Sequence, residues 1–251
     1  MKYKFIFLVF VFSNVLSFFL QAQNIDTSTK IPFVQVSYEF AIPGADLAKR
    51  FGASSTISPS FIFKTKKNYL IGAGFSYIFG NNVKQDSLFH HIKTSTHEII
   101  DGNGTYAQVY TYERGIYPAL YIGKIFDLWS ANSNSGFCIL LSAGLFQHKI
   151  RIDNPMNAAP QLKGDYRKGY DRLTNGLGIS EFIGYYYFSD KRVLNFYAGI
   201  ESMQAWTKCR RTYNFDDMGA DNSQRFELLS GFKVGWIIKL TGRNKNQFYY
   251  Y

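Results

Sequence analysis

The sequence has little cysteine, little proline and fewer charged residues than usual. Two Cys among 251 residues cannot build a disulfide framework, and no Cys/His spacing resembles a zinc site. There are 6 Pro against 21 Gly, and charged residues make up 18% of the chain. Phe and Tyr are abundant instead, at 24 and 19 residues, which argues against intrinsic disorder. The length suits one large β domain or two small domains.

The first 22 residues have the layout of a secretory signal peptide. Lys2 and Lys4 precede an apolar stretch from Phe5 to Leu20, and Ala22 stands at a plausible cleavage position. The alternative is an uncleaved membrane anchor, for which the apolar core is short and interrupted. Without the two lysines the formal net charge of +10 falls to +8. We expect export with cleavage of 1–22, which excludes the cytoplasm and a nucleic-acid partner.

No later segment approaches the roughly 20 apolar residues of a helical span, but several segments alternate with period two. From Arg225 to Leu240, one face carries bulky apolar residues and the other carries Glu227, Lys233, Lys239 and glycine. The same pattern gives eight expected strands, at 32–41, 54–63, 69–79, 116–126, 137–148, 176–188, 193–205 and 225–240. Small and charged residues on one face suit a narrow lumen, and the aromatic-rich apolar face suits lipid.

The expected connections alternate between long and short, with the long ones at 42–53, 80–115, 149–175 and 207–224. Short turns at one end and long loops at the other are typical of an outer-membrane barrel, whereas a soluble sandwich has no reason for this alternation. We therefore predict that residues 23–251 form an eight-stranded antiparallel up-and-down transmembrane β-barrel, placed in the outer membrane.

Three strands are harder to interpret. Ser and Pro blur the two faces of the first and second strands, so their register is open. In the sixth strand, Glu181 shares the parity of Leu177 and Ile183, although a carboxylate should not face lipid. Either a β-bulge near Ser180 resets the register, or the parity assigned to this strand is wrong.

The third long loop is the best candidate for binding. In its segment 164–172, Tyr residues alternate with Arg and Lys, whose side chains can bind the phosphates of lipopolysaccharide or an anionic partner. The candidate residues are Lys163, Tyr166, Arg167, Lys168, Tyr170 and Arg172. The alternative is a solvated loop with internal ion pairs, each of which stabilises little. The fourth long loop, in which Arg210 and Arg211 are offset by aspartates, supports no such argument.

The four histidines give weak indications of chemistry. His90, His91 and His97 share the second long loop with carboxylates, but their spacing matches no known metal motif, so we expect no metal and no cofactor. His148 ends the fifth strand, at the level where some barrel enzymes that modify lipid A hold a His and a Ser. No Ser lies two positions further on, so we expect no catalytic residues, and a lipid A-modifying enzyme remains the alternative.

The inward-facing charges and the two cysteines give structural expectations. We expect Glu201, Glu227, Lys233 and Lys239 to form buried pairs and line no pore, because an eight-stranded lumen is filled by its own side chains. On this reading, loss of Glu227 leaves Lys233 uncompensated. Cys138 and Cys209 are placed near opposite rims, too far apart for a disulfide.

The leader end at residues 18–23, the Tyr/Phe-rich strands and the final Tyr249-Tyr250-Tyr251 resemble small outer-membrane β-barrel proteins of Bacteroidota with an OmpA/OmpX-like architecture. The segments 42–52, 169–176 and 233–237 look similar to an uncharacterised group of these barrels. The chain departs from the usual ending, since 241–251 follows the last strand. The resemblance implies a non-enzymatic structural or partner-binding role, with an outer-membrane or periplasmic protein partner, and would allow an accessory role beside the gliding or type IX secretion machinery.

Overall fold

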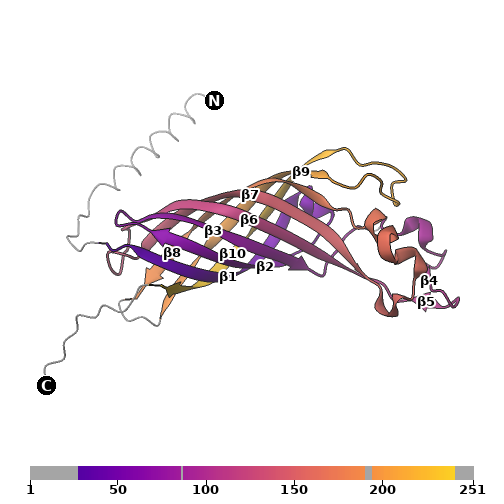
Figure 1. The fold of residues 1–251 in the computed structure, drawn as a ribbon, viewed down its shortest axis with the longest axis horizontal. Helices are drawn as coiled ribbons and strands as arrows, with labels where there is room; N and C mark the ends of the chain where they lie inside the picture. The colour runs from indigo at the N-terminus through magenta and orange to yellow at the C-terminus, as the bar shows by residue number, and fades with distance from the viewer. Residues whose placement is uncertain (1–27, 86, 190–193, 241–251) are drawn as a thin grey trace, which may run out of the picture.

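A computed structural model describes residues 28–85, 87–189 and 194–240, so the expected signal peptide and the tail 241–251 lie outside the described residues. Eight long antiparallel strands close into a barrel in the order β1-β10-β9-β8-β7-β6-β3-β2 (Figure 1). Their bounds are β1 Ile31–Ala45, β2 Ser54–Lys64, β3 Tyr69–Gly80, β6 Tyr110–Phe126, β7 Gly136–Asp153, β8 Thr174–Phe188, β9 Asn195–Cys209 and β10 Gln224–Lys239. The predicted fold class and all eight strands are confirmed.

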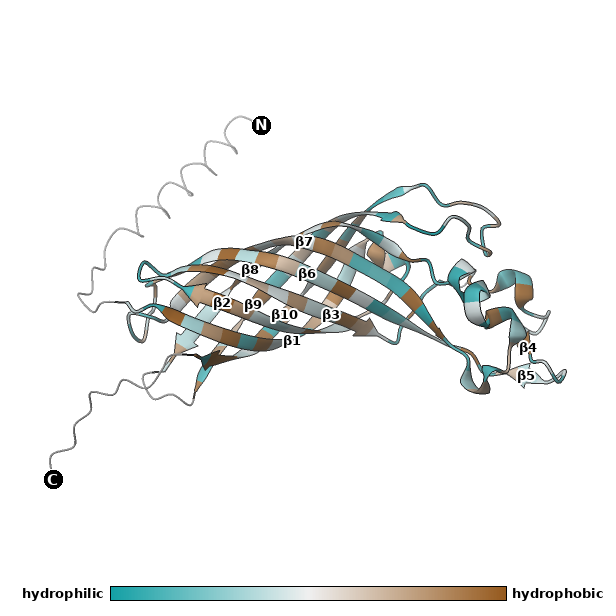
Figure 2. Cartoon of the chain, in the orientation of Figure 1, coloured by the Kyte–Doolittle hydropathy of each residue, from teal (hydrophilic) through white to brown (hydrophobic). Residues whose placement is uncertain are grey.

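The barrel wall has a polar inner face and an apolar outer face. In β1, Gln35 and Glu39 are buried inside, while Tyr38 and Phe40 are about half exposed outside, at 46% and 52%. Successive side chains of a strand point to opposite faces, so the period-two pattern of the sequence becomes this separation. Figure 2 shows the hydrophobic residues along the wall and the hydrophilic ones toward the outer loops.

The register of the three difficult strands is continuous. In β2, the small polar residues Ser54, Thr56, Ser58 and Ser60 point inward. In β8, Leu177 pairs with Trp206 and Glu181 pairs with Ser202 without a skipped residue, so the expected bulge near Ser180 is absent from this described strand. The parity of Glu181 was correct, and the expectation that it avoids the outer face was wrong: Glu181 is exposed there.

The connections at the two ends of the barrel follow the predicted alternation with one exception. The connections after β2 and β8 are short and those after β3, β7 and β9 are long, but the connection 46–53 after β1 is one residue shorter than the connection 127–135 after β6, because β1 continues to Ala45. The described chain begins and finishes at the short-turn end, where the Leu240 amide donates to the Pro32 carbonyl over 2.9 Å (Figure 1). In the described residues, no helix is long and apolar enough to cross a membrane.

Short elements of secondary structure build the outer loops. One of them is a small hairpin of β4 (Ile99–Ile100) and β5 (Tyr106–Ala107), which was not predicted from the sequence. The five 3₁₀ helices are η1 Leu47–Lys49, η2 His90–Ile92, η3 Pro155–Asn157, η4 Pro160–Leu162 and η5 Gly164–Gly169. Leu47 and Phe51, in and just after η1, are fully buried and close the outer mouth of the barrel.

Side chains fill the lumen. Tyr186 stacks on Tyr197 with ring centroids 4.6 Å apart, and Phe182 meets Tyr197 edge-on at 5.6 Å. Around these rings and Lys233, a cavity of only about 10 Å³ remains, which is close to the space that one water molecule needs. The lumen of the described barrel is therefore filled by side chains, as expected for eight strands.

Both cysteines are buried and free, as predicted. Cys138 pairs in register with Ile125, beside a short turn, whereas Cys209 pairs with Thr174 at the outer end of β8. The length of the barrel wall separates the two thiols.

Candidate functional site

The outward face of the β6–β7 hairpin carries a cluster of cations at its outer end. Arg114 of β6 lies directly opposite Lys149 of β7, and Tyr112 lies opposite Arg151. Lys149 and Arg151 are exposed, and the Arg114 guanidinium lies over the Tyr112 ring at 5.1 Å. Like charges directly opposite each other on one face of a sheet repel, so Arg114 and Lys149 together form a site that attracts an anion.

These residues line a cleft of about 530 Å³ between the strand ends and η5. We call its basic residues the outer collar: Arg114, Lys149, Arg151, Arg167, Lys168 and Arg211. Lys168 forms an ion pair with Asp165 at 2.6 Å, and Arg211 pairs with Asp171. Among the described residues, the other four collar cations have no carboxylate within salt-bridge distance, which leaves the cleft with an excess of positive charge.

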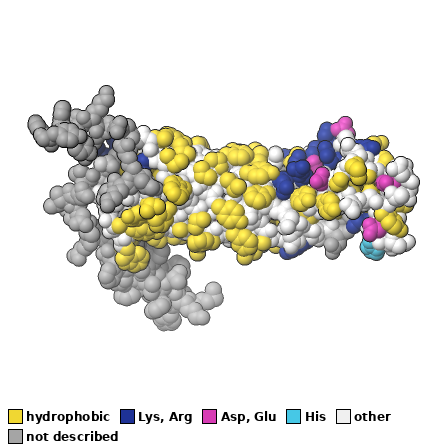
Figure 3. Space-filling model, turned by 90° about the horizontal axis from the view of Figure 1, so that it is seen from below, with side chains coloured by type: hydrophobic (Ala, Val, Ile, Leu, Met, Phe, Trp, Pro, Cys, Tyr) yellow, Lys and Arg dark blue, Asp and Glu magenta, His cyan; other side chains and the backbone are white. Residues whose placement is uncertain are grey.

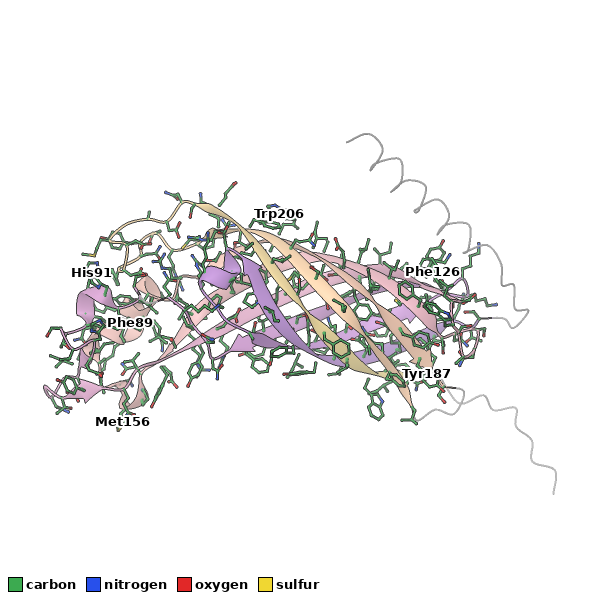
Figure 4. All side chains as sticks on the ribbon, turned by 180° about the vertical axis from the view of Figure 1, so that it is seen from behind. Phe89, His91, Phe126, Met156, Tyr187 and Trp206 are labelled. Carbon is green, nitrogen blue, oxygen red and sulfur yellow. The ribbon has the colours of Figure 1, made fainter. Side chains whose placement is uncertain are left out.

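The outer collar begins where the apolar outer face ends. On β6, the outward residues from Ile116 to Ile122 are apolar, with Leu120 and Ile122 exposed at 70% and 60%. Arg114 is the next outward residue of β6 toward the outer loops. Figure 3 shows Lys and Arg gathered beyond the apolar wall, on the side of the outer loops. In Figure 4, Trp206 lies toward that end of the wall, and Phe126 and Tyr187 lie near the opposite end.

The structure divides the six binding residues predicted in the third long loop into two groups. Lys163, Tyr166, Arg167 and Lys168 are exposed on and beside η5, and two of them belong to the outer collar. Tyr170 is buried against Phe89 and Phe215, with ring centroids 5.3 Å away in both cases. Arg172 is also buried and bonds within the protein, so neither of these two side chains presents itself to a ligand.

Arg172 joins the third long loop to the fourth. Its guanidinium donates to Asp216 over 3.0 Å, lies 2.7 Å from Asp217 and lies 3.7 Å from Asp221. Burial alone would raise the pKa of Asp221, but hydrogen bonds from Ser223 and Arg225 lower this pKa from 3.8 to about 2. Asp216 and Asp217 of the fourth loop therefore pair with Arg172 of the third loop, and Asp221 pairs with Arg225 at the start of β10. None of the three pairs with a cation of the outer collar among the ion pairs of the described residues.

His148 points into the barrel mouth. Its Nε2 lies 3.0 Å from both carboxylate oxygens of Glu227, and Phe51 and Phe146 pack on its ring. The imidazole is 1% exposed. An acyl chain on the outer surface of the barrel would not reach this nitrogen.

The expected link between Glu227 and Lys233 is wrong. Glu227 bonds to His148, and Lys233 donates a hydrogen bond to Glu201 and lies 3.9 Å from Glu39. Ser180 in turn donates to Glu201 over 2.6 Å. All of these side chains face the lumen, so the predicted inward orientation of Glu201, Glu227 and Lys233 is confirmed.

The loop histidines do not assemble a ligand set. His90 and His91 lie side by side in η2, with ring centroids 5.3 Å apart. In the part of the chain that the structure describes, no group of three or more His, Cys, Asp or Glu comes together as metal ligands would.

Arg114, Lys149 and Arg151 were predicted to lie in long loops, whereas the structure places all three in strands. The contribution of strand residues to the cleft was not predicted from the sequence. The alternation of Tyr110, Tyr112 and Arg114 with smaller or buried residues was a faint signal that β6 begins earlier than position 116.

Comparison with known proteins finds similarity only at the level of structure. No protein-family model matches the chain, and no curated protein matches it. Neisserial surface protein A is similar with 14% identity over 83% of this chain and 97% of its own, at a TM-score of 0.42. Ail of Yersinia pestis, whose structure was solved with the heparin analogue sucrose octasulfate, is 8% identical; the match covers 84% of this chain and 99% of Ail, at a TM-score of 0.39. The N-terminal β-barrel domain of Pseudomonas aeruginosa OprF is 11% identical; the match covers 84% of this chain and 99% of that domain, at a TM-score of 0.38.

Proposed function

We propose that this chain is a non-enzymatic outer-membrane β-barrel protein whose outer collar binds the phosphate groups of lipopolysaccharide. The membrane placement is supported by the outer face of the barrel. Residues 116–126 of β6 match the about 9–11 residues that a tilted strand needs to cross a bilayer, and their outward side chains are apolar except Lys124, which lies over the rings of Tyr69 and Phe126 near the short-turn end. Glu39, Glu201 and Lys233 are buried inside the barrel, which is the arrangement that hydrocarbon outside the barrel favours, and Glu181 is exposed on the outer face.

The outer collar carries the binding proposal. Arg114, Lys149 and Arg151 lie on the outward face just beyond the apolar wall, at the level that lipid headgroups would occupy. Phosphate accepts charge-assisted and bidentate hydrogen bonds from guanidinium groups. A phosphate seated between Arg114 and Lys149 would remove the repulsion between these two cations.

Lipid binding by a charge-removed variant tests this function. The double variant Lys149→Gln/Arg151→Gln should bind lipopolysaccharide at least tenfold more weakly, because two charge-assisted hydrogen bonds at about 1.5–3 kcal/mol each exceed the 1.4 kcal/mol of a tenfold change. The matched control is Lys66→Gln/Lys67→Gln, which removes two exposed cations from the short turn at the opposite end. Equal losses in the two variants, or equal binding of lipid A with and without its phosphates, would refute phosphate recognition by the outer collar.

The alternative function, a lipid A-modifying enzyme, receives no support from the site. His148 is buried inside the barrel mouth and is held by Glu227, so its imidazole faces away from a lipid on the outer surface.

On the sequence resemblance alone, we also propose an origin in Bacteroidota and an accessory role beside gliding or type IX secretion machinery, with an outer-membrane or periplasmic protein partner. Cross-linking in native membranes, followed by identification of the captured proteins, tests this finer proposal.

A further inference from the structure

Polar side chains interrupt the apolar outer wall on β8, β9 and β10. Glu181 lies near the middle of β8, with Leu177 and Ile183 outside on either side of it at 57% and 50% exposure. Glu181 is directly opposite Ser202 in register, and Ser202 is directly opposite Ser230. We call these three residues the polar strip. It runs in register across three adjacent strands.

The hydrogen bonds of the polar strip are incomplete. Ser202 Oγ and Ser230 Oγ share one hydrogen bond of 2.9 Å, so one of the two hydroxyl protons has no acceptor in this bond. Among the described residues, the Glu181 carboxylate has no hydrogen-bond or ion-pair partner. The polar strip therefore contains an unused acceptor beside an unused donor.

In a lipid bilayer this arrangement is costly. Hydrocarbon offers no partner for a hydroxyl or a carboxylate, and an ionisable residue on a lipid-exposed surface destabilises a barrel most near the bilayer centre. Polar side chains within membranes associate with polar groups on a neighbouring segment. This step rests on the membrane placement proposed above.

We infer that the outward face of β8, β9 and β10 is the interface of a homodimer in the membrane. In the dimer, Glu181 of each copy accepts a hydrogen bond from the Ser202–Ser230 pair of the other copy. A two-fold contact buries the same patch on both copies, so the patch must hold a donor and an acceptor side by side. The polar strip does so.

The second copy fits better than a different protein that offers a cation. A cation would pair with Glu181 but would leave the hydroxyl proton of the serine pair without an acceptor. A second polar strip gives the Glu181 carboxylate of each copy a donor and the spare hydroxyl proton of each copy an acceptor.

Photo-cross-linking in native outer membranes tests the dimer. A benzophenone amino acid replaces Ile200, which is 64% exposed on β9 and lies two positions from Ser202. The matched control replaces Phe75, which faces outward on β3, across the barrel from β9. We expect a cross-linked band of two chains from position 200 and none from position 75. Adding Glu181→Leu should lower the position 200 yield at least fivefold, whereas Glu181→Gln, which keeps an acceptor oxygen, should retain most of it.

The outcomes separate this inference from the proposed function. Each variant is also run on a gel with and without boiling, because a closed barrel in detergent migrates differently once it is unfolded. A normal gel shift with equal dimer yields from positions 200 and 75, or with a yield that Glu181→Leu leaves unchanged, would overturn the dimer and leave the barrel intact. A cross-link from position 200 to a different protein would also overturn it. Loss of the gel shift in the unsubstituted chain would instead contradict the membrane barrel itself.

Discussion

Lys233 lies inside the barrel between two carboxylates. Its ammonium group donates to Glu201 and lies 3.9 Å from Glu39, and its side chain is 7% exposed. Removing one partner of a buried ion pair leaves the other charge without compensation, which is far more costly than the pair is stabilising. The cation therefore holds the polar half of the core together, below the stacked ring of Tyr197.

Replacing this cation should destabilise the barrel strongly. Lys233→Met keeps the length of the side chain and leaves two carboxylates facing each other, so we expect the free energy of unfolding to fall by about 3–5 kcal/mol. Urea unfolding in detergent micelles, followed by heat-dependent gel mobility, measures the change. The control Lys67→Met removes an exposed lysine of a short turn and should change stability by less than about 0.5 kcal/mol. Equal stability of the two variants would mean that the buried cation has no structural role.

At the residue scale, the sequence predicts which way a side chain faces but not what it contacts. Period-two alternation placed Glu227 and Lys233 in the lumen, because alternation is a property of a single strand. Their partners come from other strands: His148 from β7 and Glu201 from β9. On one strand, Glu227 and Lys233 lie about 20 Å apart at 3.3 Å per residue, which excludes the link first expected.

At the scale of elements, the third and fourth long loops form one unit. Arg172 reaches Asp216, Asp217 and Asp221, and Arg211 reaches back to Asp171. These crossed ion pairs fix the position of η5, and with it the outer wall of the collar cleft.

Acid should loosen the fourth long loop at Asp221, whose carboxylate accepts hydrogen bonds from Ser223 and Arg225. Because the folded pKa of Asp221 is about 2 and lies below its ordinary value of 3.8, the carboxylate stabilises the folded loops above about pH 4, and this contribution is lost as the pH falls toward 2. Hydrogen exchange of the amides in 210–223 should therefore accelerate between pH 5 and pH 2 more in the wild type than in Asp221→Asn. Comparison of the two proteins at each pH removes the intrinsic pH dependence of exchange. An identical response of both proteins would show that Asp221 does not hold the loops.

The strand centres were predictable from the sequence, but the outer strand ends were not. Within the apolar wall, one face is bulky and the other small or charged, so the alternation is strong. Beyond it the contrast changes: β7 continues to Asp153 with apolar Ile150 and Ile152 inside and charged Lys149 and Arg151 outside, the reverse of the pattern in the wall, and β6 continues to Tyr110 through residues of mixed polarity. The outer collar lies in this region, so the sequence identified the basic loop and missed the strand residues beside it.

At the scale of the whole molecule, the barrel has two unlike ends. The long loops, the collar cleft and η5 are at one end, while the short turns and both described chain ends are at the other (Figure 1). An exported chain that inserts from the periplasm with an even number of strands keeps both ends on that side. The long loops then face the outside of the cell, where lipopolysaccharide lies.

Surface labelling of intact cells should report this orientation. An amine reagent too large to pass through porins should modify Lys163 and Lys168, which are exposed on the outer loops, and should leave Lys66 and Lys67 unmodified. All four ammonium groups are exposed, so accessibility of the side chain itself does not separate them. Mass spectrometry of tryptic peptides identifies the modified lysines, and cells with a permeabilised outer membrane provide the control in which all four react. Modification of Lys66 and Lys67 in intact cells, with Lys163 and Lys168 protected, would invert the orientation. The collar would then lie among the periplasmic headgroups of the inner leaflet, away from lipopolysaccharide.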